Sequence, residues 1–172
     1  MLFRSDQAIE FARDHRRRLQ SDNVELFVHF DLSSEADNLQ SVNDLFGIVL
    51  RNTRLTEQEI HQLRTAFLEM GQNAIEWGNR YDSSKMVRIN THVSPDRVEI
   101  VITDEGSGFD PRNLPHASGG GEDPTMHFPV RQMLGIRDGG FGILMAKGLV
   151  DEVKYNDVGN VVTLIKRIAP LT

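Results

Sequence analysis

The sequence predicts a two-layer α/β sandwich, in which a mixed, mostly antiparallel β-sheet carries its helices on one face. Two observations predict this class. Segments with helical periodicity and segments with strand periodicity are interspersed along the chain, and the chain closes on two strand-like segments separated by a short turn. The length of 172 residues suits a single domain, 1–172, with a core of its own.

The first half of the chain predicts a helix, a strand and two further helices. Residues 5–20 are a charged segment with helical spacing, for which Ser5 is a candidate N-cap. Residues 24–32 alternate apolar with polar side chains, which predicts a half-buried strand. A helix follows to about residue 50, and the capping box that begins at Thr56 predicts the start of a longer one.

The long helix, predicted over 56–77, carries a stripe of apolar side chains at three- and four-residue steps. Such a stripe faces a core. Glu69 follows the stripe residue Phe67 by two positions, so its side chain points away from Phe67. The stripe consists of Ile60, Leu63, Phe67, Met70, Ala74 and Trp77, and we expect Trp77 to pack in the core at the helix end.

The second half predicts two strands, a long irregular segment, a short helix and two closing strands. Residues 110–139 hold five of the 14 glycines and four of the six prolines. An irregular segment of this length inside a compact domain usually has a function, and we expect a lid over a binding site. The predicted strands are 86–93, 97–103, 151–156 and 160–168, and the predicted helix is 142–150.

Three short motifs carry chemistry. Glu69 and Asn73 lie four residues apart on the long helix, where a carboxylate and an amide can orient a proton acceptor and offer oxygen to Mg²⁺. Asp104 follows a strand and precedes two glycines, so it can accept a hydrogen bond from an exocyclic amine. The glycines at 139–142 precede a helix start, which is a phosphate-binding arrangement. Each motif alone is also compatible with a polar helix face or a plain turn.

In this order, the three motifs resemble those of the Bergerat-fold ATPases, the superfamily of gyrase, MutL, heat-shock chaperones and histidine kinases. The N box is matched by residues 69–73 with Trp77-Gly78-Asn79 at its end, and the two glycine boxes by 104–109 and 140–142. Within the superfamily, the chain is most similar to the bacterial anti-sigma factor serine kinases. It departs from them in Trp77 and in the length of the lid.

The resemblance implies roles for individual residues. Glu69 would be the general base that activates a serine hydroxyl, Asn73 would hold Mg²⁺ among the ATP phosphates, and Asp104 would bind the adenine amine. An arginine would meet the γ-phosphate, with Arg137 as the candidate and Arg131 as the other. The glycines that would line the nucleotide are Gly106, Gly108, Gly140 and Gly142.

The resemblance also implies a cytoplasmic protein kinase that phosphorylates a STAS-type anti-anti-sigma protein, sequesters a sigma factor or similar regulator, and forms a homodimer. Two alternatives remain open: a nucleotide-gated binding module without kinase activity, and a catalytic ATPase domain that works with a separate histidine phosphoacceptor. The formal net charge of −6 disfavours nucleic-acid partners, and the absence of cysteine excludes thiolate chemistry. We expect no membrane span, since no apolar stretch is long enough.

Overall fold

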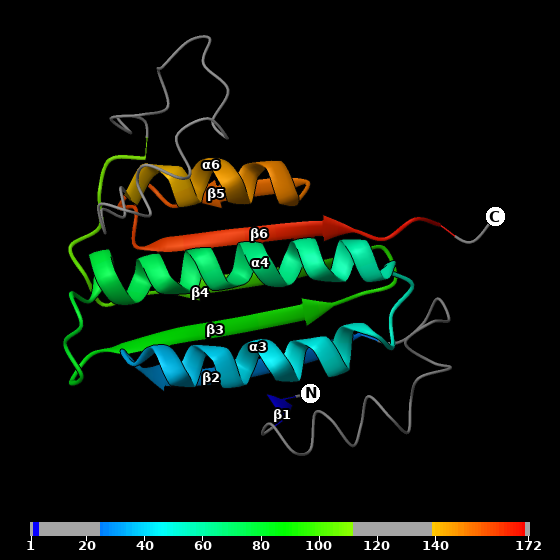
Figure 1. Ribbon diagram of the computed structural model, residues 1–172, viewed down its shortest axis with the longest axis horizontal. Coiled ribbons are helices and arrows are strands. Elements are labelled where there is room, and N and C mark those ends of the chain that lie inside the picture. Colours follow the sequence, from blue (N-terminus) through cyan, green and yellow to red (C-terminus); the bar gives the residue numbers. More distant parts are fainter. Residues whose placement is uncertain (1, 4–24, 112–138, 171–172) are drawn as a thin grey trace, which may run out of the picture.

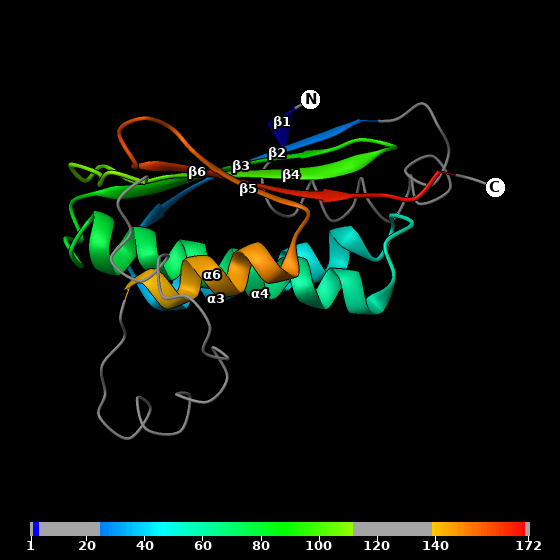
Figure 2. The same ribbon diagram turned by 90° about the horizontal axis from the view of Figure 1, so that it is seen from above.

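The computed structural model describes residues 2–3, 25–111 and 139–170. In these residues the chain forms one six-stranded sheet in the order β1-β2-β3-β4-β6-β5 (Figure 1). Three α-helices lie together on one face of this sheet (Figure 2). The elements are β1 (Leu2–Phe3), β2 (Leu26–Ser33), α3 (Ala36–Leu50), α4 (Glu57–Asn73), η1 (Ala74–Gly78), β3 (Met86–Val93), β4 (Arg97–Thr103), α6 (Gly139–Leu149), β5 (Glu152–Tyr155) and β6 (Val161–Arg167).

The sheet is mixed and mostly antiparallel, as predicted. Within the described residues β1 and β2 pair in parallel, and the four other strand pairs are antiparallel. The last hairpin places β6 beside β4 and leaves β5 at the edge. The fold class predicted from the sequence is therefore confirmed, including the placement of the helices on one face.

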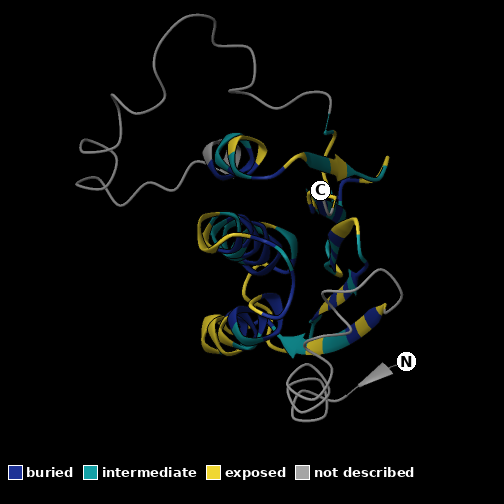
Figure 3. Ribbon diagram, turned by 90° about the vertical axis from the view of Figure 1, so that its right-hand side faces the viewer, coloured by how far each residue is buried: buried dark blue, intermediate teal, exposed yellow. Residues whose placement is uncertain are grey.

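The core lies between the sheet and the helix layer. Strand β3 illustrates this: Val87 and Ile89 are buried under the helices, while Arg88 and Asn90, which alternate with them, are exposed on the open face. Helices α3 and α4 contribute their apolar stripes, and the rings of Phe46 and Phe67 meet edge-on at 4.8 Å between centroids. Figure 3 shows the buried residues of these helices on the sides that face the sheet.

Local sequence signals explain where most elements begin and end. The capping box of α4 is formed: the Glu59 amide donates to Thr56 Oγ1 at 3.2 Å, and the Thr56 amide donates to Glu59 Oε2 at 2.8 Å. The closing strands turn at Gly159, whose φ of +83° is one that glycine adopts freely. No helix in the described ranges is long and apolar enough to cross a lipid bilayer.

Several element boundaries differ from the predictions. Helix α6 begins at Gly139 rather than Gly142, so Gly140 and Gly142 lie in its first turn and not in a loop before it. The closing strands are a residue shorter at each end than predicted. The helix predicted over 5–20 and nearly all of the lid predicted over 110–139 lie outside the described residues.

The prediction that Trp77 packs in the core is wrong. Helix α4 ends at Asn73 and continues as the π-helical turn η1, whose wider turn rotates each residue less than an α-helix does. The stripe is therefore lost after Ala74. Ile75 is 1% exposed and takes the buried position at this end, whereas Trp77 is 57% exposed.

The contrast between Ile75 and Trp77 in η1 predicts different effects of substituting each by alanine. Ile75→Ala removes a fully buried side chain and should lower the free energy of unfolding by about 2–5 kcal/mol. Trp77→Ala, on a largely exposed side chain, should change it by only about 0.5 kcal/mol. Urea unfolding of both variants measures this. A larger loss for Trp77→Ala than for Ile75→Ala would mean that the helix continues in α-helical register.

Candidate functional site

Glu69 and Asn73 project from α4 toward the first turn of α6. A β-carbon added at Gly142 would lie 3.0 Å from Glu69 Oε2 and 3.4 Å from Asn73 Nδ2. The α6 backbone is therefore in contact distance of both polar groups, and a side chain at position 142 would fill the space between them. The structure brings together the N-box pair and the second glycine box, which are about 70 residues apart in the sequence.

The side chain of Asn73 lacks one hydrogen-bond partner among the described residues. Its amide nitrogen Nδ2 is buried and has no hydrogen-bond partner in the described part of the chain. Burial of such a group without a partner is costly, so a polar ligand there would be favourable. A rotation of the amide would present its oxygen instead, which is a ligand type that Mg²⁺ accepts.

Asp104 lies at the end of β4 and is enclosed by two glycines. The Gly106 amide donates to Asp104 Oδ1 at 2.8 Å. A β-carbon at Gly78 would lie only 2.5 Å from the same oxygen, and one at Gly106 would collide with the Gly78 carbonyl. Only glycine fits at these positions, because the backbones of η1 and the glycine box lie directly against the carboxylate.

Asp104 is half-buried, and its charge affects the nearby Tyr155. Burial raises the pKa of Asp104 above the ordinary aspartate value, and the Gly106 amide offsets part of this shift. Burial, and then the charge of Asp104, raises the pKa of Tyr155. The Tyr155 ring meets Phe109 edge-on at 5.1 Å, and its hydroxyl donates to Met70 Sδ at 3.3 Å. A half-buried carboxylate beside aromatic rings suits a flat base with an exocyclic amine.

Asn79 holds this region together, and sequence reasoning assigned it no role. Its side chain is 0% exposed. Its Oδ1 accepts from the Glu105 amide at 2.8 Å, and its Nδ2 donates to Ser34 Oγ at 2.9 Å and to the Met86 carbonyl at 3.0 Å. The sequence signal was its place directly after Gly78, at the end of the N box.

The remaining predicted residues are placed as follows. Gly108 has a φ of +73° and lies against the Val158 carbonyl, so it shapes the loop after Asp104. Gly140 lies in the first turn of α6. Arg137 and Arg131, the candidates for the γ-phosphate, lie outside the described residues. Their roles stay predictions.

The residues present fit ATP with Mg²⁺. The unpartnered amide of Asn73, the carboxylate of Glu69 and the close α6 backbone form one polar end, and Asp104 with its aromatic neighbours forms the other. No group of three or more His, Asp or Glu side chains gathers in the described ranges to hold a metal alone. Asn73 would therefore hold Mg²⁺ together with phosphate oxygens.

The sequence matches the histidine kinase-like ATPase domain family over residues 32–166. This region contains the N-box pair, Asp104 and both glycine boxes, and it covers the sheet except for β1, most of β2 and the last residue of β6. The family match and the site thus rest on the same residues.

Curated relatives are serine-protein kinases named RsbW. The chain is 26% identical over 110 residues to that of Oceanobacillus iheyensis and 30% identical over 112 residues to that of Bacillus subtilis. Each match covers 64% of this chain and 66% of the relative, slightly less than two thirds of its length. The relative from Staphylococcus epidermidis is 23% identical over 145 residues, which cover 83% of this chain and 87% of the relative.

A solved structure shows the same fold. The crystal structure of the RsbU and RsbW domains of a Mycobacterium tuberculosis protein matches with a TM-score of 0.53 and 16% identity. The match covers 86% of this chain and 34% of that one. At this identity the likeness concerns the fold alone.

The contacts of Asn79 predict that its substitution lowers both the stability of the fold and the affinity for ATP. Asn79→Ala leaves the Glu105 amide and the Met86 carbonyl without their partner, which should lower the free energy of unfolding by about 1–3 kcal/mol per group. ATP affinity should fall about tenfold or more, because the Asp104 loop loses its anchor. Asn90→Ala is the control, since Asn90 is an exposed asparagine on β3 that also makes a side-chain bond, to His29. Equal ATP affinity in both variants, measured by calorimetry, would contradict this role.

The burial of Asp104 predicts a pH dependence of nucleotide binding. Protonation removes a hydrogen-bond acceptor, and the raised pKa means that it occurs at higher pH than for an ordinary aspartate. ATP affinity should therefore weaken as the pH falls toward the raised pKa of Asp104, at a higher pH than an ordinary aspartate would give. Asp104→Asn should weaken binding by about 1–3 kcal/mol at neutral pH and flatten this dependence. Calorimetry across the range would refute the assignment if the variant binds like wild type.

Proposed function

Because the chain belongs to the family of histidine kinase-like ATPase domains, we propose that it binds ATP–Mg²⁺ and acts as a serine-protein kinase of the anti-sigma factor type. The observation that carries this proposal is the junction of α4 and α6, where Glu69 and the unpartnered Asn73 amide meet the Gly142 backbone. A carboxylate base and a metal-binding amide on one helix turn suit phosphoryl transfer to a hydroxyl.

The names of the relatives support a proposal for the substrate class. Proteins named serine-protein kinase RsbW match the chain at 23–30% identity. By analogy, the acceptor would be a serine of a STAS-type anti-anti-sigma protein, and the sequestered partner a sigma factor or similar regulator. A cytoplasmic homodimer belongs to the same proposal.

The chain's own residues would act as follows. Asp104 and the rings beside it would position the base, and the α6 N-terminus would offer backbone N–H groups to phosphate oxygens. Glu69 would take up the proton that the serine hydroxyl loses as its oxygen bonds to the γ-phosphorus and ADP leaves. Bound Mg²⁺ would neutralise phosphate charge, and Asn73 would hold it in place.

The role of Glu69 separates a kinase from a binding module. Glu69→Gln keeps the shape and loses the basic carboxylate, so ATP affinity should stay within about twofold while transfer to a cognate STAS protein falls about 10²–10⁴-fold. Glu57→Gln is the control, because Glu57 lies in the first turn of the same helix, far from Asn73. Transfer is measured as phosphoserine on the STAS protein by mass spectrometry.

Asn73→Ala should behave differently from Glu69→Gln. It should weaken the Mg²⁺-dependent part of ATP binding as well as transfer, because the amide rather than a base is lost. Full transfer by Glu69→Gln would exclude its role as general base. A wild-type protein that binds ATP but phosphorylates no STAS protein would favour the nucleotide-gated binding module. Phosphate on a histidine of a separate protein would favour the histidine phosphoacceptor.

A further inference from the structure

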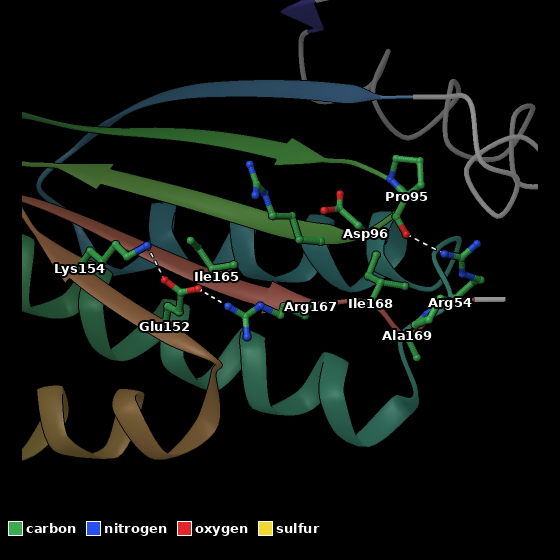
Figure 4. A pocket seen from close by; sticks show the side chains of 11 residues that line it. Arg54, Pro95, Asp96, Glu152, Lys154, Ile165, Arg167, Ile168 and Ala169 are labelled. Carbon is green, nitrogen blue, oxygen red and sulfur yellow. Dashed lines mark hydrogen bonds and ion pairs between the residues drawn. The ribbon is translucent and has the colours of Figure 1, made fainter. Parts of the chain in front are cut away.

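A second cleft lies at the end of the sheet away from the candidate nucleotide site (Figure 4). It has a volume of about 750 Å³ and is formed by β4, β5, β6 and the turns beside them. Strand β4 separates the two sites, since Arg97 at its start lines the cleft and Asp104 follows its end. Seven residues of extended strand correspond to about 23 Å.

The walls of the cleft are fixed by hydrogen bonds between segments that are distant in sequence. Arg54 Nη2, from the α3–α4 connection, donates to the Pro95 carbonyl at 2.7 Å. The Ile168 amide donates to the Asp96 carbonyl at 2.7 Å. The Arg167 amide donates to Asp151 Oδ2 at 2.6 Å. These bonds join the α3–α4 connection to the β3–β4 turn, that turn to the end of β6, and β6 to the residue before β5, so the cleft is preformed rather than made by a ligand.

The cleft is basic on a chain that is acidic overall. Four cationic side chains line it against two carboxylates, while the whole chain has a formal net charge of −6. Ser94 Oγ donates to Asp96 at 2.6 Å, and Glu152 is shared by Lys154 and Arg167. A third carboxylate, Glu99 beside the cleft, pairs with Arg97 at 3.8 Å, so four cations face three carboxylates and the local charge stays positive. The cationic side chains are Arg54, Arg97, Lys154 and Arg167.

These charges are accessible and spread out. The side chains of Arg97, Lys154 and Arg167 are 46%, 62% and 68% exposed. They come from three different strands, and Figure 4 shows Lys154 and Arg54 at opposite ends of the cleft. Cations arranged in this way suit several separate anionic groups along an extended ligand better than they suit a single phosphate.

Between the charges the cleft offers an apolar floor. Ile165 and Ile168 are 7% and 6% exposed, and Pro95 and Pro170 complete this surface. Ile165 points to the open side of the sheet, where the neighbouring strand positions carry Glu99 and Glu152. An apolar floor with a basic rim is complementary to a segment that alternates acidic and apolar side chains.

We propose that this cleft is a second binding site, separate from the nucleotide site, for an extended acidic segment of a protein partner. The cations along the rim receive the carboxylates, and the floor of Ile165 and Ile168 receives the apolar side chains between them. The inference does not depend on kinase activity, because none of its residues belongs to the candidate nucleotide site.

The test uses the full chain and a fluorescein-labelled peptide that alternates aspartate with leucine. Fluorescence anisotropy should show binding that weakens with added salt and is absent for the same peptide with lysine in place of aspartate. Saturating ATP–Mg²⁺ should not displace the peptide. The double variant R97E/R167E should weaken binding about tenfold or more. A control double variant, R51E/K147E, carries the same change of charge outside the cleft and should bind as wild type does.

Three outcomes would overturn the proposal. One is the absence of peptide binding up to about 1 mM. Another is equal weakening by the two double variants, which would show a response to net charge alone. The third is displacement by inorganic pyrophosphate at low millimolar concentration, which would indicate a small-anion site. R97E/R167E loses the ion pairs to Glu99 and Glu152, so its unfolding temperature should fall slightly. Cooperative thermal unfolding and unchanged ATP binding verify that a loss of peptide binding is not a loss of fold.

Discussion

The candidate nucleotide site depends on one buried side chain, Asn79. Its amide joins three segments that are otherwise separate: the end of the N-box helix, the start of β3 and the glycine box after β4. Because it uses both its donor and its acceptor on backbone groups, no residue of another shape can replace it. The position of Asp104, two bonds from the Glu105 amide that Asn79 holds, follows from this contact.

The backbone on both sides of Asn79 has unusual geometry. The π-helical turn η1 comes before it, and Arg80 and Tyr81 after it both have positive φ, at 56° and 57°. Two consecutive non-glycine residues in this region cost free energy that surrounding contacts must offset. The Asn79 bonds and the bond from the Tyr81 amide to the Ile75 carbonyl at 2.9 Å are such contacts. This backbone strain lies next to the candidate nucleotide site and not in the described strands of the sheet. Strain of this kind is commonly found at binding sites.

Periodicity and local motifs predicted the sheet, the capping box at Thr56 and the location of Glu69 and Asn73 on one side of α4, because each depends on neighbours in the sequence or on a fixed helical period. Trp77 was predicted wrongly because α4 passes into the π-helical turn η1, a change of period that the spacing of the apolar residues does not reveal. Tyr155 carries no local signal, because its position beside Asp104 results from the pairing of β5 with β6. The roles of Arg137 and the lid stay predictions.

The burial of Asp104 links the stability of the fold to its ligand. Its pKa in the folded protein lies above the unfolded value, so this group stabilises the fold fully only at low pH, and its contribution is lost as the pH rises through the folded pKa. Above that pKa the ligand-free protein carries a partly desolvated charge with the Gly106 amide as its neighbouring donor. A ligand amine would supply a second hydrogen-bond donor to the carboxylate. Binding would therefore offset the desolvation free energy that folding imposes on Asp104. Selectivity for a base with such an amine would then follow from the same desolvation.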